Sequence, residues 1–147
     1  MDCYSCQAQA GLRQISPGPT IYEGRYWLVE HAYPCRLAGW LVLVLKRHAE
    51  AVHELTPAEC AELGALQGRT ARTLAAVLDC EKEYVLGLAE APHFHHVHVH
   101  IVAKPRDLPA EFVGAKIFAL LKTEDAPPVP PALIARLCEE LRAAFLP

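Results

Sequence analysis

The sequence predicts a single α+β domain that spans residues 1–147. Three features support this class: short segments rich in β-branched and aromatic residues, one long helix with a clear start signal, and a segment in which histidines alternate with aliphatic residues. The chain has 147 residues, which is the size of one ordinary domain. Hydrophobic residues make up 52% and charged residues 21%, a balance typical of folded proteins with one hydrophobic core.

Five segments are predicted to be β-strands because each is short and rich in bulky or β-branched residues. Residues 20–22 and 26–29 are expected to form a hairpin. Residues 39–45 are almost continuously apolar, which is typical of a strand buried on both faces. Two further strands are predicted over 83–89 and 96–104.

The clearest helix start lies at Thr56. Threonine is a favoured N-cap residue, Pro57 fits the first helical position, and Glu59 completes a capping box three residues after the cap. We expect this helix to end near Leu78 and to pack one face against the sheet.

Residues 105–147 are predicted to form a C-terminal helical extension. One helix is expected over 110–121 and another over 132–145, with a proline-rich spacer at 127–131 between them. The last helix is too short to be stable alone, so it must dock on the rest of the domain or on a partner subunit.

Composition and charge exclude several classes of protein. The net charge of -3 at pH 7 lacks the basic footprint that general nucleic-acid binding requires. No run of about eighteen apolar residues and no export signal is present, so we expect a cytoplasmic protein that does not enter a membrane. The six cysteines are then expected to be reduced thiols. The glycine-rich loops of kinases and dehydrogenases are missing.

The segment 96–104 carries a histidine at each of three alternate positions: His96, His98 and His100. Alternate side chains of a strand point to the same face, so the three imidazoles are expected to line one surface, about 6.5–7 Å apart. With an unperturbed pKa of about 6.5, one imidazole can offer a nucleophilic nitrogen while a neighbour donates a proton. The pattern alone leaves three interpretations open: a catalytic site for phosphate, a transition-metal site, or solvated residues on an outer strand.

Two separated motifs occur in a fixed order along the chain. Residues 39–48 read GWLVLVLKRH and are followed by ELTPAE at 54–59, which suggests a strand, a basic turn and a helix start. Residues 96–102 read HVHVHIV, three histidines that alternate with apolar residues. Together these motifs resemble the histidine-triad family of nucleotide-phosphate enzymes. The resemblance covers about residues 3–104 and does not extend to the C-terminal helices.

The resemblance implies a fold, an assembly and an activity. The fold is an antiparallel sheet of about five strands flanked by a long helix, usually paired into a homodimer. The activity is hydrolysis or transfer at the α-phosphate of a nucleotide or dinucleotide. By position, His98 is the implied nucleophile that forms a nucleotidyl-histidine intermediate, and His100 contacts the phosphate and assists catalysis. His96 is a further candidate contact to the substrate.

Family members that begin with Cys-x-x-Cys bind a structural zinc ion. The resemblance implies the same ligands here, namely Cys3, Cys6, His48 and His96. Two thiolates and two imidazoles make a closed tetrahedral site, which would tie the N-terminus to two strands. The alternative is a terminus without metal, because a single Cys-x-x-Cys is a weak motif.

The chain departs from the family pattern at the residues that contact substrate. The Asn and Gln that usually precede the triad have no counterpart, and Glu90, His93 or His95 could replace them. The usual ribose-binding aspartate is also missing, and Glu30 and His31 are its nearest equivalents. We therefore expect Glu30 and His93 to contact the substrate.

The sequence favours a dinucleoside polyphosphate hydrolase or nucleoside phosphoramidase. Nucleotidyltransferases of the family usually carry glutamine where His100 stands, so the third histidine favours hydrolysis. Two alternatives remain: a nucleotidyltransferase, or a nucleotide-binding or zinc-binding protein with little catalysis. Trp27 and Trp40 lie in apolar strands and are expected to be core residues.

Overall fold

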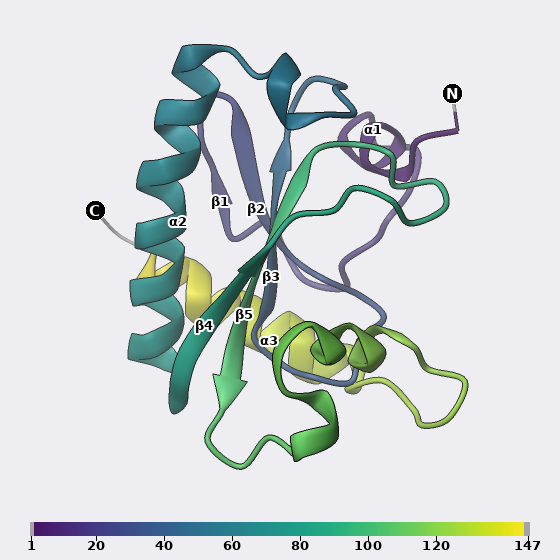
Figure 1. Cartoon of the computed structure of the whole chain (residues 1–147), viewed down its shortest axis with the longest axis vertical. Helices are drawn as coiled ribbons and strands as arrows, with labels where there is room; N and C mark the ends of the chain where they lie inside the picture. The colour runs from purple at the N-terminus through teal and green to yellow at the C-terminus, as the bar shows by residue number, and fades with distance from the viewer. Residues whose placement is uncertain (1, 146–147) are drawn as a thin grey trace.

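A five-stranded antiparallel sheet forms the centre of the molecule (Figure 1). The structure is a computed structural model that describes residues 2–145, so Met1 and residues 146–147 of the predicted domain lie outside the described residues. The strand order is β1-β2-β3-β5-β4, and every neighbouring pair is antiparallel. The strands are β1 (Tyr22–Glu23), β2 (Trp27–His31), β3 (Trp40–Leu45), β4 (Cys80–Leu86) and β5 (His98–Pro105). The predicted α+β class with an antiparallel sheet is confirmed.

The register of the three central strands divides their side chains between two faces. Alternate residues point to opposite faces, so residues paired across strands share a face. One face carries two rows of paired residues, Leu28 with Val44 and His98, and Glu30 with Val42 and His100. The row between them, Val29 with Leu43 and Val99, is buried in the main hydrophobic core on the other face.

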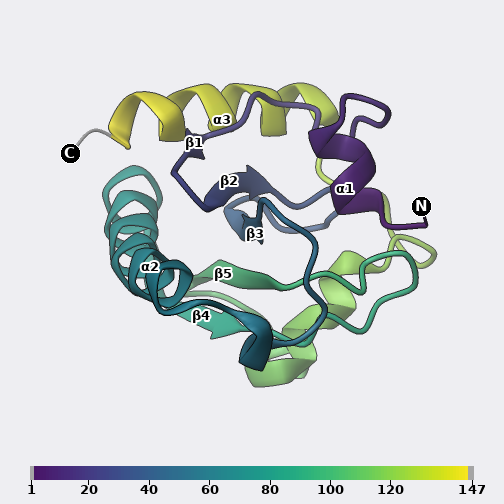
Figure 2. The same cartoon turned by 90° about the horizontal axis from the view of Figure 1, so that it is seen from above.

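Helix α2 (Pro57–Val77) covers the hydrophobic face of the sheet (Figure 2). Its predicted capping box is confirmed: Thr56 Oγ1 accepts from the Glu59 N–H at 3.3 Å, and Glu59 Oε2 accepts from the Thr56 N–H at 2.7 Å. Leu66 and Leu74 of α2 are buried in the core, as expected for a helix with one face on the sheet.

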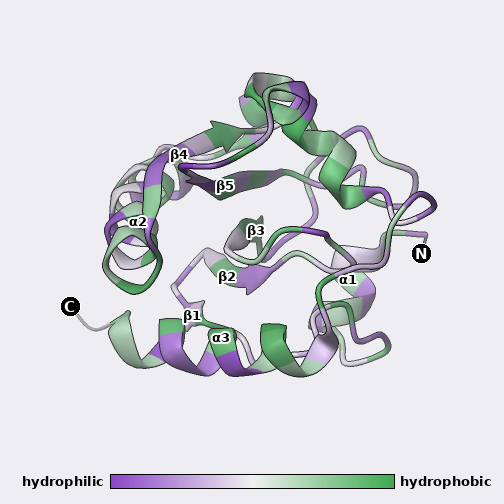
Figure 3. Ribbon diagram, turned by 90° about the horizontal axis from the view of Figure 1, so that it is seen from below, coloured by the Kyte–Doolittle hydropathy of each residue, from purple (hydrophilic) through white to green (hydrophobic). Residues whose placement is uncertain are grey.

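The last helix, α3 (Pro131–Ala144), docks on the same chain. It packs against α2 and β2, and it buries Ile134, Leu137, Cys138 and Leu141 in the main core. Figure 3 shows hydrophobic and hydrophilic residues alternating along α3, the pattern of a helix with one buried face. Arg69 of α2 donates to the backbone carbonyl of Phe145 at 2.7 Å, which ties the end of α3 to the long helix.

The predicted helix over 110–121 is wrong in type and continuity. The segment forms two 3-10 helices, η2 (Ala110–Phe112) and η3 (Gly114–Leu121). They are separated because Val113 is extended, with ψ 140°, and Gly114 adopts a φ of +74° that favours glycine. The buried residues of η3 pack on Trp40 and Val102 and cover one end of the sheet face opposite α2.

Strand boundaries differ from the predictions by one or two residues at the ends of β1, β2 and β3 and by up to three residues in β4 and β5. β4 begins at Cys80 and ends at Leu86, three residues before the predicted limits at each end. β5 begins at His98, because the N–H groups of His96 and Val97 bond to Phe94 O and Ala49 O outside the ladder. Two short helices complete the described fold, α1 (Tyr4–Gln9), which the sequence did not predict, and η1 (Val52–Glu54). No helix within the described residues is long and apolar enough to span a membrane.

Candidate active site

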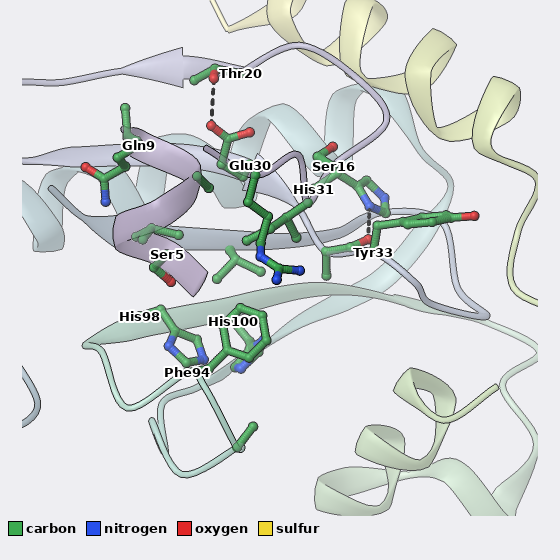
Figure 4. Close-up of a pocket in the computed structure, with 18 of the residues that line it drawn as sticks. Ser5, Gln9, Ser16, Thr20, Glu30, His31, Tyr33, Phe94, His98 and His100 are labelled. Carbon is green, nitrogen blue, oxygen red and sulfur yellow. Dashed lines mark hydrogen bonds between the residues drawn. The ribbon is translucent and has the colours of Figure 1, made fainter. Parts of the chain in front are cut away.

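A cavity of about 800 Å³ lies over the sheet face that carries His98 and His100. Its floor is formed by side chains of β2, β3 and β5, including Val42 and Val44, which are therefore half-buried and not buried on both faces as predicted. Helix α1 contributes Ser5 and Gln9 to the wall (Figure 4). The segments that follow α1, follow β2 and precede β5 also line the cavity, together with Phe118 and Leu121 of η3.

His98 is positioned with one ring nitrogen bound and the other free. Its Nδ1 lies 2.6 Å from the backbone carbonyl oxygen of His96, which can only accept, so Nδ1 carries the proton. The Nε2 atom therefore keeps its lone pair. Burial lowers the pKa of His98, which favours the neutral, nucleophilic imidazole.

His100 is held in the opposite tautomer. The indole N–H of Trp40 donates to His100 Nδ1 at 3.0 Å, so Nδ1 carries no proton and the neutral ring carries it on Nε2. Burial, together with the neighbouring His98, lowers the pKa of His100 to about 3, so this ring is neutral at pH 7. The rings of His98 and His100 are neighbours in an edge-on arrangement, with centroids 4.9 Å apart (Figure 4). One ring can attack an electrophile while its neighbour donates a hydrogen bond.

His96 does not share this surface, so the prediction that three imidazoles line one face is wrong. The residue precedes β5, is fully buried, and is not part of the cavity wall. Its Nε2 lies 2.7 Å from the carbonyl oxygen of Leu45, to which it donates. This bond turns Nδ1 toward Cys3 and Cys6 and away from the cavity.

The four predicted metal ligands lie together. One donor atom from each of Cys3, Cys6, His48 and His96 lies within 4.8 Å of the others. His96 Nδ1 is 3.4 Å from Cys3 Sγ and 3.6 Å from Cys6 Sγ, and His48 Nδ1 is 3.5 Å from Cys6 Sγ. Tetrahedral zinc with bonds of about 2.3 Å to sulfur and about 2.05 Å to nitrogen places these atoms about 3.5 Å apart. The donor set and its spacing fit zinc.

Both histidines of this cluster present Nδ1 inward and bind an oxygen through Nε2. The partner is Leu45 O for His96 and Glu50 Oε1, at 3.4 Å, for His48. Such outer contacts are the usual way to orient an imidazole ligand. Burial and the adjacent Cys3 raise the pKa of Cys6 to about 11, so a cation would relieve the cost of placing two thiolates here.

Several known structures with the same arrangement of elements are described as histidine-triad proteins. A hypothetical histidine triad nucleotide-binding protein from Sulfolobus tokodaii has a TM-score of 0.73 and 18% identity, over 97% of this chain and 91% of its own. A histidine triad protein from Bradyrhizobium japonicum has a TM-score of 0.71 and 19% identity, over 87% and 90%. The chain has the histidine-triad fold.

A zinc-bound protein also shares the histidine-triad fold. This histidine triad family protein from Mycobacterium smegmatis has a TM-score of 0.69 and 19% identity, over 97% of this chain and 92% of its own. No protein-family model and no curated protein matches the sequence. The fold shared with these known structures confirms the resemblance to the histidine-triad family at the level of the fold.

Within the histidine-triad fold, the two predicted substrate contacts outside the triad differ in position. Glu30 lies in the cavity wall across from the two histidines, and Thr20 Oγ1 donates to its carboxylate at 2.6 Å (Figure 4). Burial raises the pKa of Glu30. His93 lies outside the wall: its ring stacks on Tyr4 with centroids 4.5 Å apart, and its Nδ1 is 2.8 Å from Asp2 Oδ1. The position of His93 therefore does not support the predicted substrate contact.

Sequence reasoning missed two features of the site. Trp40 was predicted to be a core residue, and it is fully buried, but its indole N–H also contacts His100. Its place on the histidine face follows from strand alternation once β3 is known to pair with β5. The cations of the wall, Arg13 and Lys46, were also missed, because no local pattern distinguishes them from surface charges.

Proposed function

We propose that this chain is a nucleotide hydrolase that cleaves a phosphoanhydride or phosphoramidate bond at the α-phosphorus. The observation that carries the proposal is the pair of opposed tautomers: His98 with a free Nε2 lone pair, and His100 with an Nε2–H, at the floor of one cavity. A nucleophile beside a hydrogen-bond donor is the minimum that covalent phosphoryl chemistry needs.

The reaction proceeds in two displacements. His98 Nε2 attacks the α-phosphorus, the bond to the leaving group breaks, and a nucleotidyl-histidine forms while Nδ1 stays bonded to the His96 carbonyl. The leaving group departs with the bonding electrons: an anhydride releases a phosphate anion, and a phosphoramidate releases an amine that has taken a proton from water. Water then attacks the same phosphorus, His98 regains its lone pair, and a nucleoside monophosphate and one proton are released. The Nε2–H of His100 donates to a phosphate oxygen in both steps and stabilises the charge that builds there.

The other wall residues support a nucleotide as substrate. The cavity volume of about 800 Å³ is within the usual range for small-molecule sites. Glu30, opposite the histidines, offers a carboxylate for a sugar hydroxyl, and Arg13 and Lys46 offer positive charge for further phosphates. Dinucleoside polyphosphates and nucleoside phosphoramidates are the substrates we propose.

We further propose that Cys3, Cys6, His48 and His96 hold a structural zinc ion. Three sulfur–nitrogen distances of 3.4, 3.5 and 3.6 Å support this ligand set, because they match the sulfur–nitrogen spacing of a tetrahedral S₂N₂ site. The ion would tie α1 to the strand ends and would leave no ligand position open for substrate. A homodimer in the cytoplasm completes the proposal.

The decisive experiment replaces the nucleophile. We expect His98→Ala to abolish release of monophosphate from diadenosine tetraphosphate and from adenosine phosphoramidate, and added imidazole to restore part of the activity of His98→Gly. The matched control is His53→Ala, which removes an exposed histidine outside the cavity and should retain wild-type turnover.

The same assay separates this proposal from its alternatives. Normal turnover by His98→Ala would overturn it. Wild-type protein that binds these nucleotides without releasing monophosphate would be a binding protein, and transfer of the nucleotide to an added phosphate acceptor at a rate above hydrolysis would make it a transferase.

A further inference from the structure

The indole N–H of Trp40 makes a buried contact with the candidate phosphate-binding histidine. It donates to His100 Nδ1 at 3.0 Å, and both residues are buried. We propose that Trp40 is a positioning residue, which fixes His100 as a neutral Nε2–H donor directed at the substrate phosphate. This inference rests on the proposed hydrolysis and adds a residue to its machinery.

An indole N–H can only donate, whereas an imidazole nitrogen can donate or accept. A histidine without a fixed partner exchanges between two tautomers and a cation, and only some of these forms present a proton on Nε2. The Trp40 bond is incompatible with a proton on Nδ1, because two N–H groups would then face each other. It therefore removes both the Nδ1–H tautomer and the cation from the population.

Among the described residues, Trp40 is the hydrogen-bond partner that can fix the tautomer of His100. The ring of His98 lies edge-on to His100, with ring centroids 4.9 Å apart. The ring of Phe118 in η3 also lies edge-on to His100, with ring centroids 5.1 Å apart. The titratable residues of β2, β3 and β5 that line the cavity beside His100 are His98, Glu30 and His31, and no hydrogen bond joins any of them to the His100 ring in the part of the chain that the structure describes. Trp40 also packs edge-on against Phe118 at 5.6 Å, so its indole is held in place.

The hydrogen bonds at Nδ1 of His98 and at Nδ1 of His100 thus give the two neighbouring histidines opposite roles. The His96 carbonyl forces the proton of His98 onto Nδ1, and Trp40 forces the proton of His100 onto Nε2. Without Trp40, His100 could present a lone pair to the phosphate oxygens and repel them. The expected defect is in transition-state stabilisation and not in ground-state binding.

The first test measures the tautomer directly in the ligand-free protein. Two-bond ¹H–¹⁵N correlation of uniformly labelled protein at pH 7.5 should show His100 protonated on Nε2 and not on Nδ1, and His98 in the reverse state. In Trp40→Phe, the His100 signals should move toward an average of both tautomers. A wild-type His100 protonated on Nδ1 would overturn the proposal, even if the variant does not fold.

The second test separates positioning from packing. Trp40→Phe should lower kcat by between about 10-fold and 100-fold and change KM by less than about 3-fold. This loss of kcat is smaller than the 100-fold to 1000-fold loss that is typical when a whole oxyanion donor is removed. Leu120→Ala opens a cavity in the same buried cluster without touching the Trp40–His100 bond, and it should leave kcat and the His100 tautomer unchanged.

A double-variant comparison completes the design. If Trp40 acts through His100, Trp40→Phe should cause no further loss of kcat in a His100→Ala background. An equal loss in both backgrounds would show that Trp40 acts independently and would overturn the proposal. Because the tautomer is read in the free protein, a chain without hydrolase activity would refute the proposed function and leave the tautomer result intact.

Discussion

His31 is a buried titratable residue at the end of β2 with both ring nitrogens engaged. Its Nδ1 lies 2.7 Å from Ala32 O, to which it donates, and its Nε2 accepts from the Gly39 N–H at 3.0 Å. Burial lowers the pKa of His31 to about 4, against about 6.5 in an unfolded chain. The folded protein therefore keeps this ring neutral at pH values where the unfolded chain protonates it.

This difference predicts a pH dependence of stability. The contribution of His31 is fully present above about pH 6.5 and is lost as pH falls from there toward 4, because only the unfolded state takes up the proton in that window. Denaturant unfolding of His31→Gln should show a flatter loss of unfolding free energy over this range than wild type. The control His53→Gln replaces an exposed histidine and should keep the wild-type slope. Parallel curves for wild type and His31→Gln would contradict the assignment.

At the scale of the element, the N-terminus of α2 joins a sequence-encoded cap to a tertiary ion pair. Glu59 is buried, accepts from the Thr56 N–H, and receives both Nε and Nη2 of Arg47 at 2.6 and 2.8 Å. These bonds, with that to Arg47 the largest cause, lower the pKa of Glu59 to about 2. The helix start is therefore fixed to the turn that carries the candidate ligand His48.

We expect Thr56→Ala to cost about 1 kcal/mol of unfolding free energy, since the Glu59 N–H loses its acceptor. Urea unfolding followed by circular dichroism measures this change. Glu140→Gln, on the exposed face of α3, should alter stability by less than about 0.5 kcal/mol. A Thr56→Ala protein as stable as wild type would show that Glu59 and Arg47 hold the helix start without the cap.

At the scale of the whole molecule, α3 belongs to the same hydrophobic core as the sheet. We expect Leu141→Ala to cost about 2–5 kcal/mol, because Leu141 is fully buried in that core. Leu133→Ala removes a leucine of the same helix that is 44% exposed and should cost less than about 0.5 kcal/mol. One cooperative thermal transition for both proteins would support the predicted single domain, whereas separate melting of the C-terminal segment would contradict it.

The candidate zinc ligands and the cavity share α1. Cys3 is the N-cap of α1 and Cys6 lies within it, while Ser5 and Gln9 of the same helix line the cavity. If the proposed zinc ion holds the two thiols, its loss should loosen a wall of the substrate site. We expect Cys3→Ser to lower zinc content from about one ion per chain, to lower the thermal midpoint, and to weaken nucleotide binding measured by calorimetry.

Cys60→Ser is the matched control, because it replaces an exposed cysteine outside the cluster and should retain zinc, midpoint and affinity. If Cys3→Ser loses zinc but binds nucleotide as tightly as wild type, the wall does not depend on the ion. If wild-type protein purified with zinc present contains none, the proposed ligand set is wrong.

Local sequence was sufficient for the features that depend on a few neighbouring residues. The N-cap at Thr56 follows from short-range hydrogen bonding, the hairpin of β1 and β2 from two apolar runs separated by a turn, and the shared face of His98 and His100 from strand alternation. The choice of Cys3, Cys6, His48 and His96 followed from the family resemblance, and their side chains lie together in the structure. These predictions needed no knowledge of how distant segments pack.

The tertiary structure alone decided how the histidines divide. The hydrogen bond to Leu45 O orients His96 toward Cys3 and Cys6. The hydrogen bond from Trp40 sets the tautomer of His100. Contacts with Tyr4 and Asp2 hold His93 outside the cavity. Each of these contacts joins residues more than fifty positions apart. Strand alternation states which face a side chain occupies, but a proton on a particular ring nitrogen depends on the partner that the fold brings to it.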